Sequence, residues 1–321
     1  MTQPEQNKRK NRKAFWIVLI SFLSLCFLFG IIIVLLIFKS IFSGISTTEY
    51  EYEVIKSGKE KIAIVDLDYT IITPDILVKQ IKKFREDKSI KAIVLRIDSP
   101  GGGSAATHEM YEEVKKTRDS GKPIVVSVGT VAASGGYYVA CGANKIVANP
   151  SSLVGSIGVI IQYITIRDLA EKLGIKDVTI TSGDLKDTGN PFRDVNERDK
   201  KYLQDIINDS YELFLEIVAK ERNINIDTLK NVATGRVYTG RQALKIGLID
   251  TLGTLDDAIK IAAELSNIKG EPTIIKEKKK TYFLDLLLEK ISQIGLSELN
   301  NLIKEEYLNK PILQYKYEIR K

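Results

Sequence analysis

Ser134 is the residue of this chain best placed to do covalent chemistry, because it lies between two apolar runs of different character. The β-branched residues 124–128 before it predict a buried strand, and residues 137–141 after it predict the first turns of a buried helix. A hydroxyl at such a junction lies beside backbone N–H groups without intrahelical partners, which suits a nucleophile whose attack creates an oxyanion. The alternative is an ordinary helix N-cap, since serine is among the commonest caps.

Glycines supply a second part of this chemistry. Gly135 and Gly136 directly follow Ser134, where the missing side chains let another backbone come close. Three more glycines lie in the stretch Ser-Pro-Gly-Gly-Gly at residues 99–103, between a predicted strand and a predicted helix. Backbone N–H groups there can point at a developing negative charge. The alternatives are a plain tight turn and a phosphate-binding loop, although no Gly-Lys-Ser/Thr completes a P-loop.

An activated serine needs a base, and the sequence offers two kinds. The single histidine, His108, would have to serve any Ser-His-Asp triad, but acidic and polar residues surround it on a predicted helix, so we expect it on a solvated face. A lysine can serve instead if its amine is uncharged. Because the pKa of an unperturbed lysine is ~10.4, such a lysine must be partly buried and free of a paired carboxylate.

The elements around these residues alternate in a way that predicts an α/β fold. The expected strands are residues 61–71, 91–98, 124–128 and 145–148 with a further apolar run at 156–161, and the expected helices are residues 75–86, 104–118 and a segment after Ser134. The strands are apolar on both faces, so we predict a parallel sheet flanked by helices. Helical spacing of apolar residues predicts one long amphipathic helix over residues 196–222, packed on the core.

The N-terminal region predicts a membrane anchor. Residues 14–38 carry no charge, a longer run than the ~20 residues that cross a hydrocarbon core. Four of the six net positive charges precede residue 14. The positive-inside rule therefore predicts a cytoplasmic tail at residues 1–13, a single transmembrane helix in the cell membrane at residues 14–39, and an extracytoplasmic remainder. A cleavable signal peptide would have a shorter apolar region followed by small residues.

The rest of the chain divides into a stalk at residues 40–60, a globular domain at residues 61–270, and a helical extension with a tail at residues 271–321. Within the tail, residues 311–319 alternate like an edge strand. Beyond the basic tail the charge is nearly balanced, and no basic patch with interleaved aromatic residues indicates nucleic-acid binding. The two cysteines, Cys26 and Cys141, predict neither a disulfide nor a zinc site.

Five motifs in order resemble the signal peptide peptidase A family, in its short single-copy form from Gram-positive bacteria. They lie at residues 99–103, 132–138, 155–159, 182–187 and 235–243. The resemblance covers roughly residues 61–265 and the N-terminal anchor. It implies a Clp protease/crotonase-like fold of repeated β-β-α units, with a peptidase domain at residues 61–270. Proteins of this family are membrane-anchored Ser/Lys proteases.

The resemblance also implies roles for individual residues. Ser134 matches the nucleophile, and Lys186 matches its general base. Ser156 matches the serine that orients the lysine amine. The N–H groups of Gly102 and Gly135 match the oxyanion hole.

Two further expectations concern the neighbours of these residues. Asp184 and Asp187 flank Lys186, and the family's chemistry requires that both carboxylates point away from the amine. Residues 235–243 are expected to turn the chain so that a helix caps the sheet, with Arg236 and Arg241 as less favoured candidates for binding a carboxylate.

The expected function is that of a membrane-anchored endopeptidase that degrades remnant signal peptides and unfolded segments through an acyl-enzyme. No cofactor or metal is implied. The resemblance implies a ring- or dome-shaped homo-oligomer in which neighbouring subunits share each active site. Two rival interpretations are a crotonase-type acyl-CoA enzyme, which needs no serine nucleophile, and a non-catalytic membrane scaffold of the same fold. The second is disfavoured because the serine, the lysine and both glycine loops are present.

Overall fold

The computed structural model describes residues 50–279 and 314–316, together with residues 16, 22, 24, 25 and 27–33. The predicted cytoplasmic tail, and most of the predicted anchor, stalk and C-terminal extension, lie outside the described residues. The described residues from 16 to 33 are helical, and their large apolar side chains, such as Phe22 and Phe27, are exposed. Within the described part, no helix combines the length and the apolar character that a membrane crossing requires.

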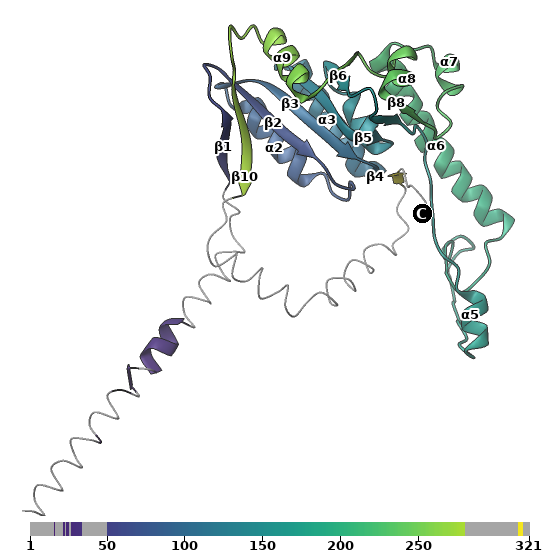
Figure 1. Ribbon diagram of the computed structural model, residues 1–321. Coiled ribbons are helices and arrows are strands. Elements are labelled where there is room, and N and C mark those ends of the chain that lie inside the picture. The colour runs from purple at the N-terminus through teal and green to yellow at the C-terminus, as the bar shows by residue number, and fades with distance from the viewer. Residues whose placement is uncertain are drawn as a thin grey trace, which may run out of the picture. The chain divides into compact units, whose positions relative to one another are not determined.

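A nine-stranded sheet forms the centre of the described domain (Figure 1). Its strands are β1 Tyr50–Lys56, β2 Lys61–Leu67, β3 Ile90–Ser99, β5 Ile124–Ala133, β6 Lys145–Ala148, β7 Leu153–Gly155, β8 Val237–Thr239, β9 Thr251–Leu252 and β10 Thr273–Lys279. The main order is β1-β10-β2-β3-β5-β6-β9, and β7 pairs with β5 and with β8. The pairs from β10 through β9 and the β5–β7 pair are parallel, whereas β7 and β8 are antiparallel. The predicted parallel sheet is therefore confirmed.

Helices cover both faces of this sheet. One face packs against α2 Asp75–Glu86, α3 Ser104–Asp119, α4 Gly135–Ala140 and α6 Glu197–Arg222, and the other against α9 Leu255–Leu265. Successive residues of β3 alternate between the two faces: Ile93 and Leu95 face α2 and α3, and Ala92 and Val94 face α9. All four are fully buried, which explains why residues 92–95 are apolar without interruption. The remaining helices are α5 Arg167–Lys172, α7 Ile226–Lys230 and α8 Gly240–Lys245.

The long helix α6 begins where the sequence predicts it. Asn196 is its N-cap, and its side chain accepts a hydrogen bond from the Asp199 N–H (2.9 Å). The Asp199 side chain accepts in return from the Asn196 N–H (3.4 Å), which completes a capping box. Thr239 and Gln242 form the same motif at the start of α8, so residues 235–243 do turn the chain into a helix.

Three segments differ from the sequence-based expectation. Residues 50–56, assigned to the stalk, form the edge strand β1, because their alternating Tyr and Glu suit a strand. Residues 273–279, assigned to the helical extension, form β10 beside β2, where Ile274 and Ile275 are buried. The apolar run at 156–161 is not a strand, and the strand lies just before it, in β7.

Candidate active site

Ser134 occupies the turn between β5 and α4, as the sequence predicts. Its φ of 52° and ψ of −118° are rare for a residue with a side chain and cost about 1–3 kcal/mol. Two backbone bonds hold this conformation: the Ser134 N–H donates to Gly155 O (2.7 Å), and the Tyr138 N–H donates to Ser134 O (2.9 Å). The side chain is 1% exposed, and within the described part Oγ has no hydrogen-bond partner and caps no N–H of α4. The interpretation as an ordinary N-cap is therefore wrong.

Ser156 occupies the equivalent position on the neighbouring strand. β5 and β7 are parallel with Ala133 opposite Gly155, so the next positions along the two strands are Ser134 and Ser156. Ser156 shares the left-handed conformation, with a φ of 53°, and is 6% exposed. Its N–H donates to Arg236 O (2.9 Å), which ties it to the segment leading into β8. The register of two strands thus delivers both serines to one end of the sheet.

The glycine stretch forms a short strand, β4 Gly101–Gly103, that is paired along both edges. On one edge, the Ile71 N–H donates to Gly101 O and the Gly103 N–H donates to Ile71 O, each at 2.8 Å. Backbone groups of successive strand residues point to opposite edges, so the N–H of Gly102 points to the other edge. There β11, Gln314–Lys316, pairs antiparallel to β4 with Tyr315 opposite Gly102.

Close contact between β4 and the serine turn leaves no room for side chains. A Cβ added to Gly102, whose φ is +158°, would lie 1.9 Å from Ile71 O. A Cβ added to Gly135 would lie 3.2 Å from the Gly102 nitrogen. The Gly102 amide therefore lies beside Gly135, whose own N–H is at the start of α4 and has no intrahelical partner. Two backbone N–H groups thus lie close to the Ser134 turn, where they can donate hydrogen bonds to an oxyanion.

His108 does not act on Ser134 in this structure. Its Nδ1 lies 2.8 Å from the Tyr138 hydroxyl, and Ser134 Oγ has no hydrogen-bond partner within the described residues. The expected solvated position is also wrong, because α4 packs beside α3 and leaves the imidazole half-buried. His108 instead contacts the hydroxyl of a buried tyrosine.

Lys186 lies on an arm, defined here as residues 160–196, which contains α5 and leads to α6 (Figure 1). Every residue from 171 to 186 is exposed, so the lysine side chain is in solvent rather than partly buried. Within the described part, neither Lys186 Nζ nor Ser134 Oγ has a hydrogen bond or ion pair, so a single chain does not join the two groups. Burial of Lys186 would have to come from outside this part of the chain.

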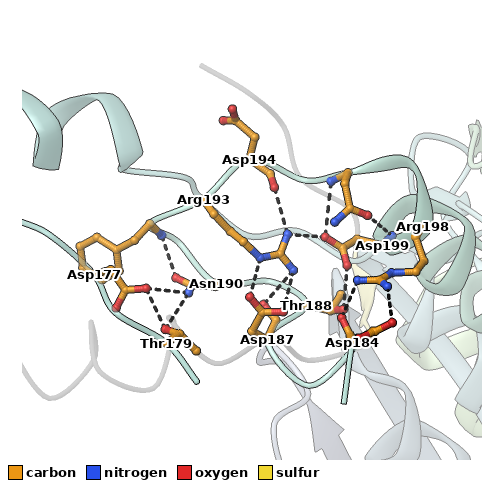
Figure 2. Close-up of polar contacts among 12 residues, drawn as sticks. Asp177, Thr179, Asp184, Asp187, Thr188, Asn190, Arg193, Asp194, Arg198 and Asp199 are labelled. Atoms are coloured by element: carbon orange, nitrogen blue, oxygen red, sulfur yellow. Dashed lines mark hydrogen bonds and ion pairs between the residues drawn. The ribbon is translucent and has the colours of Figure 1, made fainter. Parts of the chain in front are cut away.

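The carboxylates that flank Lys186 are both bound by arginines (Figure 2). Arg198 donates from Nη1 to Asp184 Oδ2 (2.7 Å). Arg193 forks onto Asp187 with Nε to Oδ2 (2.6 Å) and Nη2 to Oδ1 (2.9 Å), and this bond lowers the pKa of the Asp187 carboxyl. Both carboxylates are thus engaged by arginines, and within the described residues neither forms an ion pair with Lys186.

The same arginine fixes the end of the arm to α6. Arg193 Nη1 donates to Oδ2 of Asp199, a fully buried residue, and Thr188 donates to Oδ1 of that carboxylate (3.0 Å). The hydrogen bond from Arg193 lowers the pKa of the Asp199 carboxyl to about 2. With the Asn196 N–H of the capping box, this buried carboxylate accepts three hydrogen bonds, which order the loop between Lys186 and α6.

Sequence reasoning missed the arginine partners of these carboxylates and the partner of β11. Arg193 follows Asp187 by six residues, and Arg198 follows Asp184 by fourteen. These opposite charges indicated that an ordered loop could pair them. The alternation at 311–319 indicated an edge strand, but nothing in a sequence names the strand it pairs with. Cys141 is a free, fully buried thiol whose pKa burial raises to about 12, so it is no nucleophile, and Cys26 lies outside the described residues.

Comparison with known proteins finds a family model and several relatives that match this part of the chain. A model of peptidase family S49 matches residues 116–269, which include Ser134, Ser156 and Lys186. A protein of Enterococcus faecium provisionally named signal peptide peptidase SppA is 38% identical over 202 residues, 63% of this chain and 58% of that protein. A Synechocystis protein provisionally named as a protease is 38% identical over 214 residues, 66% of this chain and 76% of its own length.

A third relative is named as a serine protease without a provisional qualifier. The chloroplastic serine protease SPPA of Arabidopsis thaliana is 37% identical over 225 residues, which are 66% of this chain and 33% of that protein. The chain thus spans less than two thirds of the Enterococcus and Arabidopsis proteins, and more than two thirds of the Synechocystis protein.

If the Gly102 amide stabilises an oxyanion, replacing Gly102 by alanine should lower peptide turnover by about 100-fold, since the methyl group would collide with Ile71 O and displace this amide from the Ser134 turn. Steady-state kinetics on a fluorogenic peptide measure the effect. Gly121→Ala is the matched control, because Gly121 also has a left-handed φ (+87°) but no atom within 4 Å of the added carbon. Equal activity of the two variants would show that the Gly102 amide is dispensable.

The Asp199 carboxylate should make the domain sensitive to acid. Because its pKa falls from the usual 3.8 to about 2 on folding, its stabilisation is complete above about pH 4 and is lost as the pH falls toward 2. The urea midpoint of the wild-type chain should therefore drop more between about pH 5 and pH 2.5 than that of Asp199→Asn, which lacks this titration. Parallel declines in the two chains would contradict the assignment.

Proposed function

The chain belongs to peptidase family S49, the signal peptide peptidase A family, and from this we propose that it is a membrane-anchored serine endopeptidase. Its substrates are extended peptides, including signal peptides that remain after secretion. The observation that carries the proposal is the state of Ser134: a buried hydroxyl with no hydrogen-bond partner among the described residues, held in a strained turn beside two glycine amides. A strained and unsatisfied group persists where the surrounding structure maintains it for function.

In the proposed reaction, the uncharged amine of Lys186 takes the proton of Ser134 Oγ as Oγ bonds to the substrate carbonyl carbon. The carbonyl oxygen becomes an oxyanion, which accepts hydrogen bonds from the amides of Gly102 and Gly135. When the C–N bond breaks, the lysine ammonium gives its proton to the leaving amine, and an acyl-enzyme remains on Ser134. Water, deprotonated by the same amine, then hydrolyses the ester and restores both side chains.

Ser156 acts in this scheme as the group that orients the lysine amine. Its support is its position one register step from Ser134, in the same left-handed conformation and nearly as buried. With hydroxyls at the ends of two adjacent strands, the amine can act on Ser134 while the Ser156 hydroxyl orients it. Arg236 contributes through its carbonyl, which fixes the Ser156 backbone.

The edge of β4 opposite Ile71 is the proposed binding site for substrate. β11 occupies this edge as an antiparallel strand, which supports the view that an extended chain can pair there. A residue that pairs opposite Gly102 directs its carbonyl at the Gly102 N–H, next to the serine turn. Recognition through the main chain is tolerant of sequence, as a peptidase of discarded peptides requires.

We propose that the active form is a homo-oligomer in which Lys186 reaches Ser134 of a neighbouring copy. Support comes from the arm that carries Lys186, which exposes many large apolar side chains: Ile160, Ile164, Ile166, Leu169, Leu173, Ile175, Val178, Ile180 and Leu185. An exposed apolar surface of this extent marks an interaction site. A neighbouring copy that covers it would also bury the lysine, which disfavours the charged form of its amine. Sedimentation as a monomer at micromolar concentration would contradict this assembly.

The proposed location is the cell membrane, with residues 14–39 as a single-pass anchor, residues 1–13 in the cytoplasm and the catalytic domain outside. The support is the uncharged apolar run after a basic tail. Proteinase K added to intact protoplasts should digest the domain, and complete protection would contradict the orientation. No cofactor enters the proposed chemistry.

A crotonase-type acyl-CoA enzyme is the alternative within the same kind of fold, since it also binds an oxyanion between glycine amides. It requires no serine nucleophile. A peptidyl phosphonate that labels the wild-type chain, but not Ser134→Ala, would exclude the alternative, and failure of labelling would favour it. The non-catalytic scaffold would also remain unlabelled.

The identity of the base can be tested by two single substitutions. Lys186→Ala should lower turnover by about 10³-fold or more, because no other group takes the serine proton. His108→Ala should retain turnover within about fivefold and lose some stability, since the contact between the imidazole and the Tyr138 hydroxyl is removed. Both are measured with the same fluorogenic peptide after equal folding is verified by circular dichroism. Loss of turnover at His108 alone would refute the assignment of Lys186.

Removal of the C-terminal strand should make the substrate site easier to occupy. A chain that ends at residue 310 should show a KM several-fold lower with kcat unchanged, because peptides no longer compete with β11 for the edge of β4. Tyr315→Pro in the full chain is the finer test, as proline removes the N–H of the residue opposite Gly102. An unchanged or higher KM in both chains would contradict peptide binding at this edge.

A further inference from the structure

Thr107 presents an anomaly that the reaction above does not use. Among the described residues, only two buried side-chain oxygens or nitrogens lack a hydrogen-bond partner, Thr107 Oγ1 and Ser134 Oγ. Thr107 is fully buried and Ser134 is 1% exposed. Unpaired buried hydroxyls are rare and unfavourable, so each one calls for an explanation.

The two hydroxyls belong to the same small region. A Cβ added to Gly135, the residue after Ser134, would lie 2.7 Å from Thr107 Oγ1 and 3.2 Å from the Gly102 nitrogen. Thr107 therefore contacts Gly135 from the first turns of α3, on the side where the amide of Gly102 also approaches. Three chain segments, from β4, α3 and the serine turn, meet at this point.

A purely structural role does not account for this threonine. A buried threonine within a helix ordinarily donates to the carbonyl four residues before it, as Thr117 on the same helix does to Glu113 O (2.8 Å). Thr107 makes no such bond. Valine has the same shape without the unsatisfied oxygen, so packing alone would be better served by valine.

We propose that Thr107 is a positioning residue of the acyl-transfer site, which supports the Gly135 amide and directs its hydroxyl dipole toward the oxyanion as it forms. The inference rests on the proposed function, because it assigns Thr107 to the same reaction. A hydroxyl with no partner in the resting enzyme gives up no bond when charge develops beside it, so its interaction strengthens only in the transition state. Such a group accelerates the acylation of Ser134 without tightening substrate binding.

Three variants separate this role from packing. Thr107→Val should lower kcat by roughly 10- to 100-fold with KM unchanged, while its melting temperature equals or exceeds that of the wild type, since an unpaired hydroxyl is removed. Thr107→Ser should melt at a lower temperature, because a methyl group is lost, yet keep kcat within about threefold. The matched control Thr117→Val, a buried change on the same helix, should leave kcat unchanged. Phosphonate labelling of Ser134 should slow in Thr107→Val alone.

The outcomes are distinguishable. If the wild type cleaves peptide and Thr107→Val has the same kcat, the inference is overturned and the proposed function stands. An equal loss of kcat in Thr117→Val, or failure of Thr107→Ser to retain activity, also overturns it, because the effect would then follow packing rather than the hydroxyl. A wild-type chain that neither cleaves peptides nor reacts with phosphonate overturns the proposed function and the inference together.

Discussion

The contact between the glycine strand and the serine turn is the constraint on which the site depends. Gly102 lies so close to Ile71, and Gly135 so close to the Gly102 amide, that neither position has room for a side chain. The same closeness brings the Gly102 amide to the turn that holds Ser134, whose buried hydroxyl has no hydrogen-bond partner in the described part of the chain. Strain in the turn, with a φ of 52°, is maintained by the register of β5 and β7 and by the first bonds of α4.

Lys186, the proposed second half of the site, lies in an environment unlike that of Ser134. The serine lies in a close-packed core, whereas Lys186 lies on an exposed arm whose carboxylates are engaged by Arg193 and Arg198. These ion pairs contribute little to stability where they are exposed, but they decide which charges remain near the amine. In the proposed assembly, a second surface covers the apolar side chains that the arm exposes within the described part of the chain and buries Lys186 with them.

Much of this arrangement could be predicted from the sequence, because its signals are local. The junction at Ser134, the apolar strands and the long helix α6 all follow from periodicity and end signals within short windows. Strands β1 and β10 were missed, because strands far apart in the chain pair only through the fold. The exposure of Lys186, the burial of His108 against Tyr138 and the unpaired hydroxyl of Thr107 depend on contacts between elements, which no pattern in the sequence encodes.

The central claim is that a serine and a lysine from different copies of the chain form one site, and complementation tests it directly. Chains carrying Ser134→Ala and chains carrying Lys186→Ala, each with its own affinity tag, are co-expressed and purified through both tags. With random mixing, about a quarter of the interfaces combine an intact serine with an intact lysine, so about a quarter of wild-type turnover should return. Mixed oligomers that form but stay inactive would contradict the account.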